Sequence, residues 1–234
     1  MNGAQAMVKC LENEGVEMVF GYPGVAICPF YDSLLDTDIK SVLIRTEQNA
    51  AHAASGLARV TGKVGVCFAT SGPGATNLTT GIATAYYDSS PVVFITCNVT
   101  ENLLGKDAFQ EVDITGIAMP ITKATYLVRD PQTIPDIMRE AFAVAATGRP
   151  GPVLIDFLKN VTAPNELIDY EPMERKEHIK HGRLQALTRR IGWDIRTPEP
   201  NHEDVDKLAE MIAKAEKPLL ICGGGVVRGR AHKQ

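Results

Sequence analysis

The fold class of this chain is decided by the stretch Gly65-Val-Cys-Phe-Ala-Thr-Ser-Gly-Pro-Gly-Ala-Thr-Asn77. Its first five residues form an apolar run of strand length, and the glycines and proline after them predict a turn that opens a helix. Apolar runs of the same kind recur and alternate with helical patterns, at residues 16–20, 41–45, 91–96 and 152–156. Buried strands that alternate with helices indicate crossover units in a parallel sheet. We therefore expect a doubly wound α/β domain, with helices on both faces of the sheet, over residues 1–165.

The remainder of the chain has a different character. Residues 166–200 contain Pro172, Pro198 and Pro200 and many charges without a sustained period, which is typical of an interdomain linker. Residues 203–215 then predict a helix, and 218–222 predict a strand before Gly223-Gly-Gly225. Because one helix and one strand cannot bury a core, we expect residues 201–234 to be the start of an incomplete central α/β domain.

The composition excludes several classes of protein. The chain has 234 residues, of which 44% are hydrophobic and 22% charged, with a net charge of −4 spread without blocks. This argues against disorder and against a nucleic-acid surface, and no apolar run approaches a membrane span. The five cysteines include no C-x-x-C pair, which favours small buried residues in a reducing compartment over metal ligands. Without a secretion signal, we expect a cytoplasmic protein with no metal ligands of its own.

Three loops follow predicted strands and lie where ligands gather in such sheets. They are residues 21–24 (Gly-Tyr-Pro-Gly), Glu47, and residues 70–77. Each also has an ordinary explanation: a Pro-Gly turn, a surface charge at a helix start, and a capped helix start. Glu47 stands out because Ala50, Ala51 and their neighbours surround it with small apolar groups. A partly desolvated carboxyl of this kind holds a proton more readily.

Seven segments together resemble the pyrimidine-binding domain of thiamine-diphosphate enzymes, most closely that of the acetolactate synthase (acetohydroxyacid synthase) large subunit. They are residues 21–24, 45–48, 69–78, 87–91, 107–111, 121–123 and 148–152, in the family's order and spacing. The resemblance covers about residues 3–162, and the segment around residues 223–225 looks like the start of the family's central domain. It implies a carboligase that decarboxylates pyruvate and joins the two-carbon unit to a second 2-oxo acid, a step of branched-chain amino acid biosynthesis.

The resemblance also implies roles for individual residues. Glu47 matches the glutamate that hydrogen-bonds the aminopyrimidine ring and favours its imino tautomer. Gln110 matches a residue that faces the reacting centre, and Lys159 a lysine at the substrate entrance, although an ordinary solvated lysine is an equal interpretation. Residues expected on the pyrimidine side are Tyr22, Pro23, Gly24, Pro73 and Asn77, with Phe109 as an apolar neighbour of the centre. Arg149 matches a residue that touches flavin in the family, or else holds its own tight turn.

The sequence departs from the family's pattern on the substrate side, at Val25, Thr46, Cys97, Asn98, Thr100 and Leu158. These departures leave the identity of the 2-oxo acids open. The family holds the cofactor's diphosphate and its Mg²⁺ with a Gly-Asp-Gly motif, which is absent from these 234 residues. We therefore expect the magnesium ligands and most of the flavin (FAD) site to lie outside this chain, and the chain alone to be inactive.

The resemblance further implies a homodimer or tetramer, with a small regulatory subunit as an additional partner. We expect the chain to be the N-terminal part of a longer enzyme. Two alternatives remain: the pyrimidine-binding subunit of a split 2-oxo acid decarboxylase, and a non-catalytic dimerising scaffold. The presence of both Glu47 and Gln110 argues against the scaffold.

Overall fold

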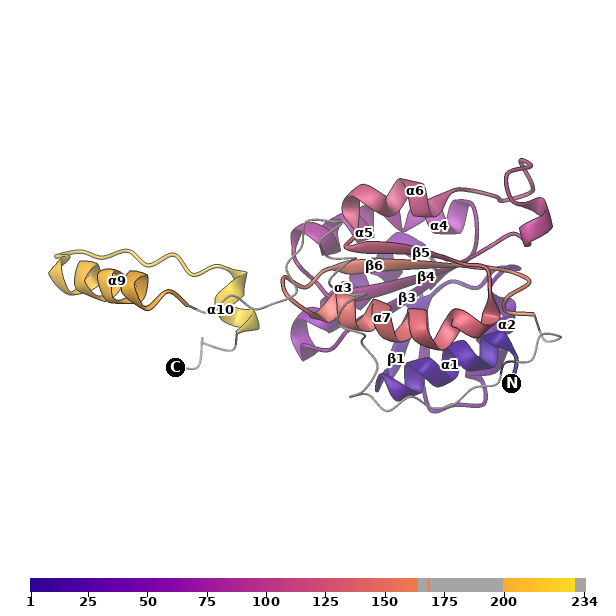
Figure 1. Cartoon of the computed structure of the whole chain (residues 1–234), viewed down its shortest axis with the longest axis horizontal. Helices are drawn as coiled ribbons and strands as arrows, with labels where there is room; N and C mark the ends of the chain where they lie inside the picture. Colours follow the sequence, from indigo (N-terminus) through magenta and orange to yellow (C-terminus); the bar gives the residue numbers. More distant parts are fainter. Residues whose placement is uncertain (164–167, 169–199, 230–234) are drawn as a thin grey trace. The chain divides into compact units, whose positions relative to one another are not determined.

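The computed structural model describes residues 1–163, 168 and 200–229. The chain divides into two compact units, Met1–Ile195 and Arg196–Gln234. The described part of the first unit contains a six-stranded parallel sheet of order β2-β1-β3-β4-β6-β5 (Figure 1). Its strands are β1 (Met18–Gly21), β2 (Lys40–Leu43), β3 (Gly65–Ala69), β4 (Val92–Asn98), β5 (Ala124–Val128) and β6 (Pro152–Leu158). The chain runs outward from β1 to β2 and then returns to β3 on the other side of β1. The strand order therefore reverses between β1 and β3, which is where doubly wound folds bind ligands.

Helices cover both faces of this sheet. One face is covered by α1 (Gly3–Asn13), α2 (Cys28–Leu34) and α7 (Ile134–Ala146). The other face is covered by α3 (Glu47–Thr61), α4 (Pro73–Asn77), α5 (Thr79–Tyr87) and α6 (Ile114–Ala118). Short 3₁₀ helices are η1 (Glu101–Leu103), η2 (Met119–Ile121) and η3 (Pro131–Thr133). The second unit contributes α9 (His202–Lys214) and α10 (Gly224–Arg228).

The helix ends follow from local sequence. At the start of α1, the Asn2 side chain accepts a hydrogen bond from the Gln5 amide at 2.9 Å, and the Gln5 side chain accepts one from the Asn2 amide at 3.0 Å. This reciprocal pair satisfies two backbone donors that the helix leaves unpaired. Helix α3 is capped at its carboxyl end by Gly62, whose φ of 73° is the left-handed conformation that glycine adopts without strain. None of the helices in the described part of the chain combines the length and apolarity that a membrane span requires.

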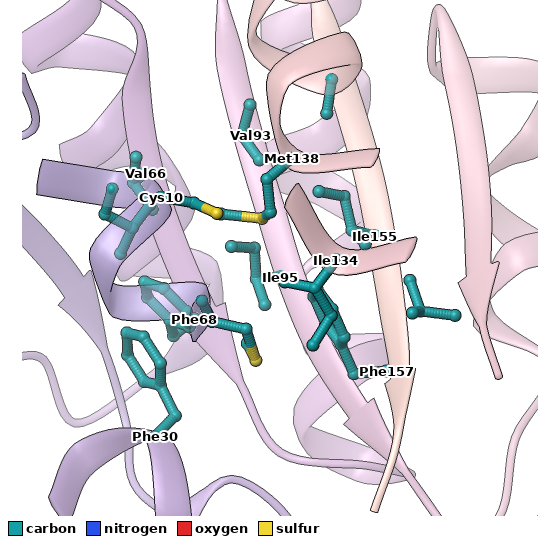
Figure 2. Close-up of a cluster of buried hydrophobic side chains, with 14 of the residues drawn as sticks. Cys10, Phe30, Val66, Phe68, Val93, Ile95, Ile134, Met138, Ile155 and Phe157 are labelled. Atoms are coloured by element: carbon teal, nitrogen blue, oxygen red, sulfur yellow. The ribbon is translucent and has the colours of Figure 1, made fainter. Parts of the chain in front are cut away.

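The sheet alternates its side chains between two cores. Val66 and Phe68 of β3 join the cluster under α1, α2 and α7, whereas Cys67 and Ala69 join the cluster under α3 and α5. Figure 2 shows the first cluster, in which Phe30 of α2 stacks on Phe68 with ring centroids 3.8 Å apart. Truncating an aromatic side chain in such a core costs about 3–5 kcal/mol. The core therefore holds β3, and the loop that follows it, firmly in place.

The structure confirms the doubly wound α/β class and corrects three details. Residues 41–45 were expected to be a buried strand, but β2 is an exposed edge strand with Leu43 61% exposed, because it has a neighbour on one side only. Residues 218–222 were expected to be a strand but are irregular and exposed, since no strand in the described part of their unit is available to pair with them. The prediction did not include β5, whose middle residues are only half-buried.

The cysteines behave largely as expected. All five are free thiols; Cys10, Cys67 and Cys97 are buried, and Cys28 and Cys222 are exposed. Burial raises the pKa of the Cys67 and Cys97 thiols above the ordinary value, so these two groups stay protonated and behave as small apolar residues.

Candidate functional site

The three loops predicted from the sequence meet at one edge of the sheet. Residues 21–24 begin at the end of β1, Glu47 opens α3 after β2, and residues 70–77 follow β3. Because β1 lies between β2 and β3 and all three run parallel, their carboxyl ends bring these loops together. This place is the reversal point of the strand order, so the fold and the sequence motifs indicate the same site.

Glu47 is the centre of this site. Its side chain is 8% exposed and lies beside Ala50 and Ala51 in the alanine-rich core of α3. The side-chain amide of Asn77 donates a hydrogen bond to Glu47 Oε2 at 2.9 Å. Within the described residues, the other oxygen, Oε1, has no hydrogen-bond partner. The site thus presents a buried carboxylate that is held by one oxygen and can accept a hydrogen bond from a ligand with the other.

Glycines allow the loops to pack closely around this carboxylate. A Cβ on Gly24 would lie 2.5 Å from Thr70 Cβ, and one on Gly74 would lie 2.8 Å from Thr70 Cγ2 and 3.2 Å from Glu47 Oε1. A Cβ on Gly72, whose φ is +60°, would lie 2.7 Å from the Gln110 carbonyl oxygen. No side chain larger than hydrogen fits at these three positions without displacing a neighbouring loop.

Thr70 is a further candidate site residue, which lies in the predicted loop 70–77 but which the sequence did not single out. It is 8% exposed, and its hydroxyl is a buried polar atom without a hydrogen-bond partner in the described structure. Native interiors rarely leave such a group unpaired, and a buried polar orphan next to a carboxylate is a mark of a binding site. No sequence pattern distinguishes this threonine, because its burial depends on how closely the loops of Gly24 and Gly74 approach it.

These observations fit the aminopyrimidine half of thiamine diphosphate. That ring carries a nitrogen that can donate to a carboxylate, and the free Oε1 of Glu47 is such an acceptor. Gly74 leaves room beside the carboxylate, because a Cβ there would lie 3.2 Å from Oε1, and Ala50 and Ala51 in the same helix as Glu47 are fully buried. In the described part of the chain, no group of three or more histidine, cysteine or acidic side chains could hold a metal ion.

We call Glu47, Asn77, Gly74 and Thr70 the Glu47 cradle. Gln110 lies next to this cradle, while its neighbour Phe109 points away from the core. Gln110 is half-buried and adopts a left-handed φ of +58°, which a non-glycine residue rarely does. Its backbone lies against Gly72, so it borders the loop that carries Asn77. Phe109 is 85% exposed and packs against little in this chain.

The remaining predicted residues are mostly exposed. Tyr22 is 41% exposed and Pro23 and Pro73 are exposed, so all three are available at the surface of the site loops. Pro23 also lines an open cleft of about 940 Å³ between α2 and β2. Lys159 directly follows β6, on the same edge of the sheet, where its backbone amide donates to the Val99 carbonyl at 3.3 Å.

Arg149 lies at the opposite edge of the sheet. It precedes the first residue of β6, whereas Glu47 follows the last residues of β2. Its Nε donates to the Ser89 hydroxyl at 2.7 Å and its Nη2 donates to the Tyr87 carbonyl at 3.2 Å. These hydrogen bonds join two turns, which is a structural role. The structure does not bring Arg149 together with the Glu47 cradle.

Asp156 is a second buried carboxyl that the sequence prediction did not single out. It lies in β6, is 1% exposed, and accepts hydrogen bonds from the Thr96 hydroxyl at 2.7 Å and the Asn98 amide at 2.8 Å. Burial raises the pKa of Asp156 to about 6, while these two hydrogen bonds oppose the rise. Asn98 also donates to the Val112 carbonyl at 3.0 Å, which ties the end of the Gln110 loop to the sheet.

Comparisons with known proteins agree with this geometry. Residues 1–117 match the family described as "Thiamine pyrophosphate enzyme, N-terminal TPP binding domain", in which thiamine pyrophosphate is another name for thiamine diphosphate. The chain is 47% identical over 234 residues to a probable acetolactate synthase large subunit of Methanocaldococcus jannaschii, covering 100% of this chain and 38% of the relative. It is 49% identical to an acetolactate synthase of Arthrospira platensis, covering 100% of this chain and 39% of that protein.

A third relative is the acetolactate synthase isozyme 2 large subunit of Escherichia coli, 47% identical over 231 residues, or 99% of this chain and 39% of the relative. The chain thus spans about two fifths of the length of these relatives. The match over residues 1–117 includes Glu47, Asn77 and the glycine loops that surround them. The chain therefore belongs to the thiamine pyrophosphate enzyme family, and its first unit carries that family's N-terminal TPP-binding domain.

Proposed function

We propose that this chain is the pyrimidine-binding part of an acetolactate synthase. In the proposed reaction, pyruvate is decarboxylated and its two-carbon unit is joined to a second 2-oxo acid. The observation that carries the proposal is the Glu47 carboxylate, which is buried, held at Oε2 by Asn77 and open at Oε1. The 45–49% identity to acetolactate synthase large subunits supports the choice of this reaction over a simple decarboxylation.

When bound, thiamine diphosphate would supply a thiazolium ring that takes up the electron pair left when a 2-oxo acid loses carbon dioxide. The role of this chain is to bind the pyrimidine ring and to hold a proton on one of its nitrogens. Glu47 Oε1 accepts the hydrogen bond of a ring nitrogen, and Asn77 keeps the carboxylate turned toward it. The backbone of Gly24, with Tyr22 and Pro23, forms one wall of the cradle, and Pro73 forms part of another.

Gln110 and Lys159 are proposed as the further catalytic residues. Gln110 borders the cradle next to Gly72 and offers an amide that can donate to a developing oxyanion. Lys159 is the first residue beyond β6 on the same edge and offers a positive charge to incoming carboxylates. Phe109, 85% exposed, would cover the centre when a second chain packs against this edge.

The other components belong to the complete enzyme. We propose residues 1–165 as the pyrimidine domain, 166–200 as a linker and 201–234 as the start of a second domain. Mg²⁺ would be held with the diphosphate by residues outside this chain. Most of the flavin site would also lie outside it, with Arg149 as the contact that this chain contributes. A homodimer or tetramer, a small regulatory subunit and a cytoplasmic location complete the proposal.

The test is co-expression of this chain with a polypeptide that carries a diphosphate-binding domain of this family, or expression of the full reading frame. Pyruvate, thiamine diphosphate and Mg²⁺ are then supplied, and the products are identified. Acetolactate that disappears in Glu47→Ala but persists in the surface variant Glu203→Ala supports the proposal. Acetaldehyde as the only product would indicate a decarboxylase instead, and thiamine diphosphate binding without turnover would indicate a scaffold.

A further inference from the structure

The loop that carries Gln110 is folded around the carboxylate of its own neighbour, Glu111. The backbone amides of Lys106 and Ala108 donate to Glu111 Oε2 at 3.3 and 3.0 Å, and the amide of Gly105 donates to Oε1. Three backbone N–H groups of one turn therefore converge on one anion. Such a concave set of amides is an anion-binding nest, and here the anion comes from within the loop itself.

The backbone of this turn adopts conformations that need support. Gly105, Asp107 and Gln110 have φ values of +76°, +52° and +58°, and only the first is a glycine. Left-handed conformations at the other two residues are unfavourable in a free chain and persist only where surrounding contacts determine them. The amides that donate to Glu111 lie on both sides of Asp107, so the Glu111 carboxylate fixes this part of the turn.

The two ends of the turn are attached to the sheet separately. Asn98, held by Asp156, donates to the carbonyl of Val112 at 3.0 Å, immediately after Glu111. At the other end, the backbone amide of Glu101 donates a hydrogen bond to Asn160 Oδ1 at 3.0 Å. Between these anchors, the Glu111 carboxylate accepts the hydrogen bonds that hold residues 105–108 against Glu111, which directly follows Gln110.

From these contacts we propose that Glu111 is the positioning residue for Gln110. Its carboxylate closes the turn, and the closed turn holds Gln110 in its left-handed conformation with its backbone against Gly72, beside the Glu47 cradle. Glu111 itself stays outside the reacting centre and acts through Gln110. This proposal rests on the proposed function for the role of Gln110, but the closure of the turn is a property of this chain alone.

The three backbone donors lower the pKa of the Glu111 carboxyl, with the amide of Gly105 as the main cause. We call the Glu111 carboxylate and the three amides that donate to it the Glu111 clamp. The clamp is therefore charged and closed throughout the neutral pH range, and acid weakens it only once the carboxyl is protonated.

The first arm of the test measures closure of the turn in the 234-residue chain. Lys106 lies within the turn and is exposed, so trypsin cleaves after it when the turn opens. We expect Glu111→Gln to raise the rate of this cleavage about tenfold, because an amide donates where a carboxylate oxygen accepted. The matched control is Glu101→Gln, which removes an exposed carboxylate that pairs with Arg129 at 3.3 Å but binds no backbone amide of the turn. Equal cleavage rates in Glu111→Gln and Glu101→Gln would overturn the clamp.

The second arm measures whether the clamp acts through Gln110 in the assembled enzyme. Glu111→Gln is expected to lower kcat/KM for pyruvate about tenfold and to leave the affinity for thiamine diphosphate unchanged. In a Gln110→Ala background, the same change should have no further effect, because the residue that Glu111 positions is gone. Independent, multiplicative losses would refute the positioning role. If the unmodified assembly shows no turnover, the proposed function fails, and the trypsin arm alone decides the clamp.

Discussion

The backbone of Gln110 lies directly against Gly72: a Cβ added to Gly72 would be 2.7 Å from the Gln110 carbonyl oxygen and 2.8 Å from its Cα. The two residues belong to loops 38 positions apart in the sequence, one after β3 and one after β4. The contact fixes the distance between the glycine loop beside Glu47 and the turn that presents Gln110.

Gly72→Ala should lower the free energy of unfolding by about 1–3 kcal/mol, because the new methyl group overlaps the Gln110 backbone and φ is +60°. The matched control is Gly56→Ala, at a position in α3 where a Cβ meets nothing within 4 Å. That variant should be neutral or more stable by about 0.5–1 kcal/mol. Urea unfolding of both variants checks the prediction, and equal effects would contradict it.

Gln110→Gly should separate stability from activity. Its φ of +58° is unfavourable for glutamine and acceptable for glycine, so the free energy of unfolding should stay the same or rise by up to about 1 kcal/mol. Turnover of the assembled enzyme should fall about tenfold or more, because the side-chain amide is lost. Gln48→Gly, on the exposed side of α3, is the control and should be destabilising by about 1 kcal/mol. A Gln110→Gly variant as unstable as this control would show that the backbone is not strained.

Asn77→Ala should weaken cofactor binding. The amide that holds Glu47 Oε2 at 2.9 Å is removed, so the carboxylate is free to turn away from the ligand. A hydrogen bond to a charged group in a partly exposed position supports a loss of about tenfold in affinity for thiamine diphosphate. Thr84→Ala, which removes a hydroxyl bonded to Thr80 within α5, should leave the affinity unchanged. Titration calorimetry on the assembled enzyme decides between these outcomes.

Asp156 should make stability depend on pH. Burial raises the pKa of Asp156 from 3.8 to about 6 in the folded state, so the folded chain holds this proton more tightly than the unfolded chain. Its stabilising contribution is therefore complete below about pH 4 and is lost as the pH rises through about 6. The loss is of the order of 3 kcal/mol at about 1.4 kcal/mol per pKa unit.

The measurement compares the native chain with Asp156→Asn, which keeps the shape and cannot ionise. The variant should gain stability relative to the native chain between pH 4 and 7, as followed by urea unfolding at each pH. The groups facing Asp156 are Thr96 and Asn98, which donate to it, and the nearby carboxylate of Asp113, which adds to the rise in its pKa. Parallel pH profiles for the two proteins would be inconsistent with a buried titrating Asp156.

Arg149→Ala should affect stability and leave the thiamine site untouched. The variant loses the bonds to Ser89 and the Tyr87 carbonyl, worth about 1 kcal/mol together at an exposed position, or about 2–4 °C in Tm. Thiamine diphosphate affinity should not change, because Arg149 lies at the other edge of the sheet from Glu47. Arg129→Ala breaks only an exposed ion pair to Glu101 and should leave the Tm nearly unchanged. Weaker thiamine binding with an unaltered Tm would contradict this assignment.

The sequence alone determined the fold class and the loops of the site. Apolar runs such as residues 65–69, alternating with helical patterns, require a covered parallel sheet, because strands without polar faces must be buried on both sides. The glycine motifs at residues 21–24 and 70–77, together with Glu47, predicted a candidate site, because each of them follows one of the three strands β1, β2 and β3. The sequence could not reveal the exposed edge position of β2 or the absence of a strand at 218–222, since both depend on which neighbours are present to pair.

Only the tertiary structure decided how individual atoms are used. The hydrogen bond from Asn77 to Glu47 joins residues 30 positions apart, and no local pattern encodes it. The unpaired hydroxyl of Thr70, the buried Asp156 and the Glu111 clamp arise in the same way, from contacts between loops that the sheet brings together. Arg149 is separated from Glu47 because it precedes a strand, whereas Glu47 follows one, and the two ends of parallel strands lie at opposite ends of the sheet. Sequence spacing alone does not say which contacts the Arg149 side chain makes there. The periodicity of apolar residues determines the layers of helices and sheet and the ends of the strands. The pairing of polar atoms depends on three-dimensional packing.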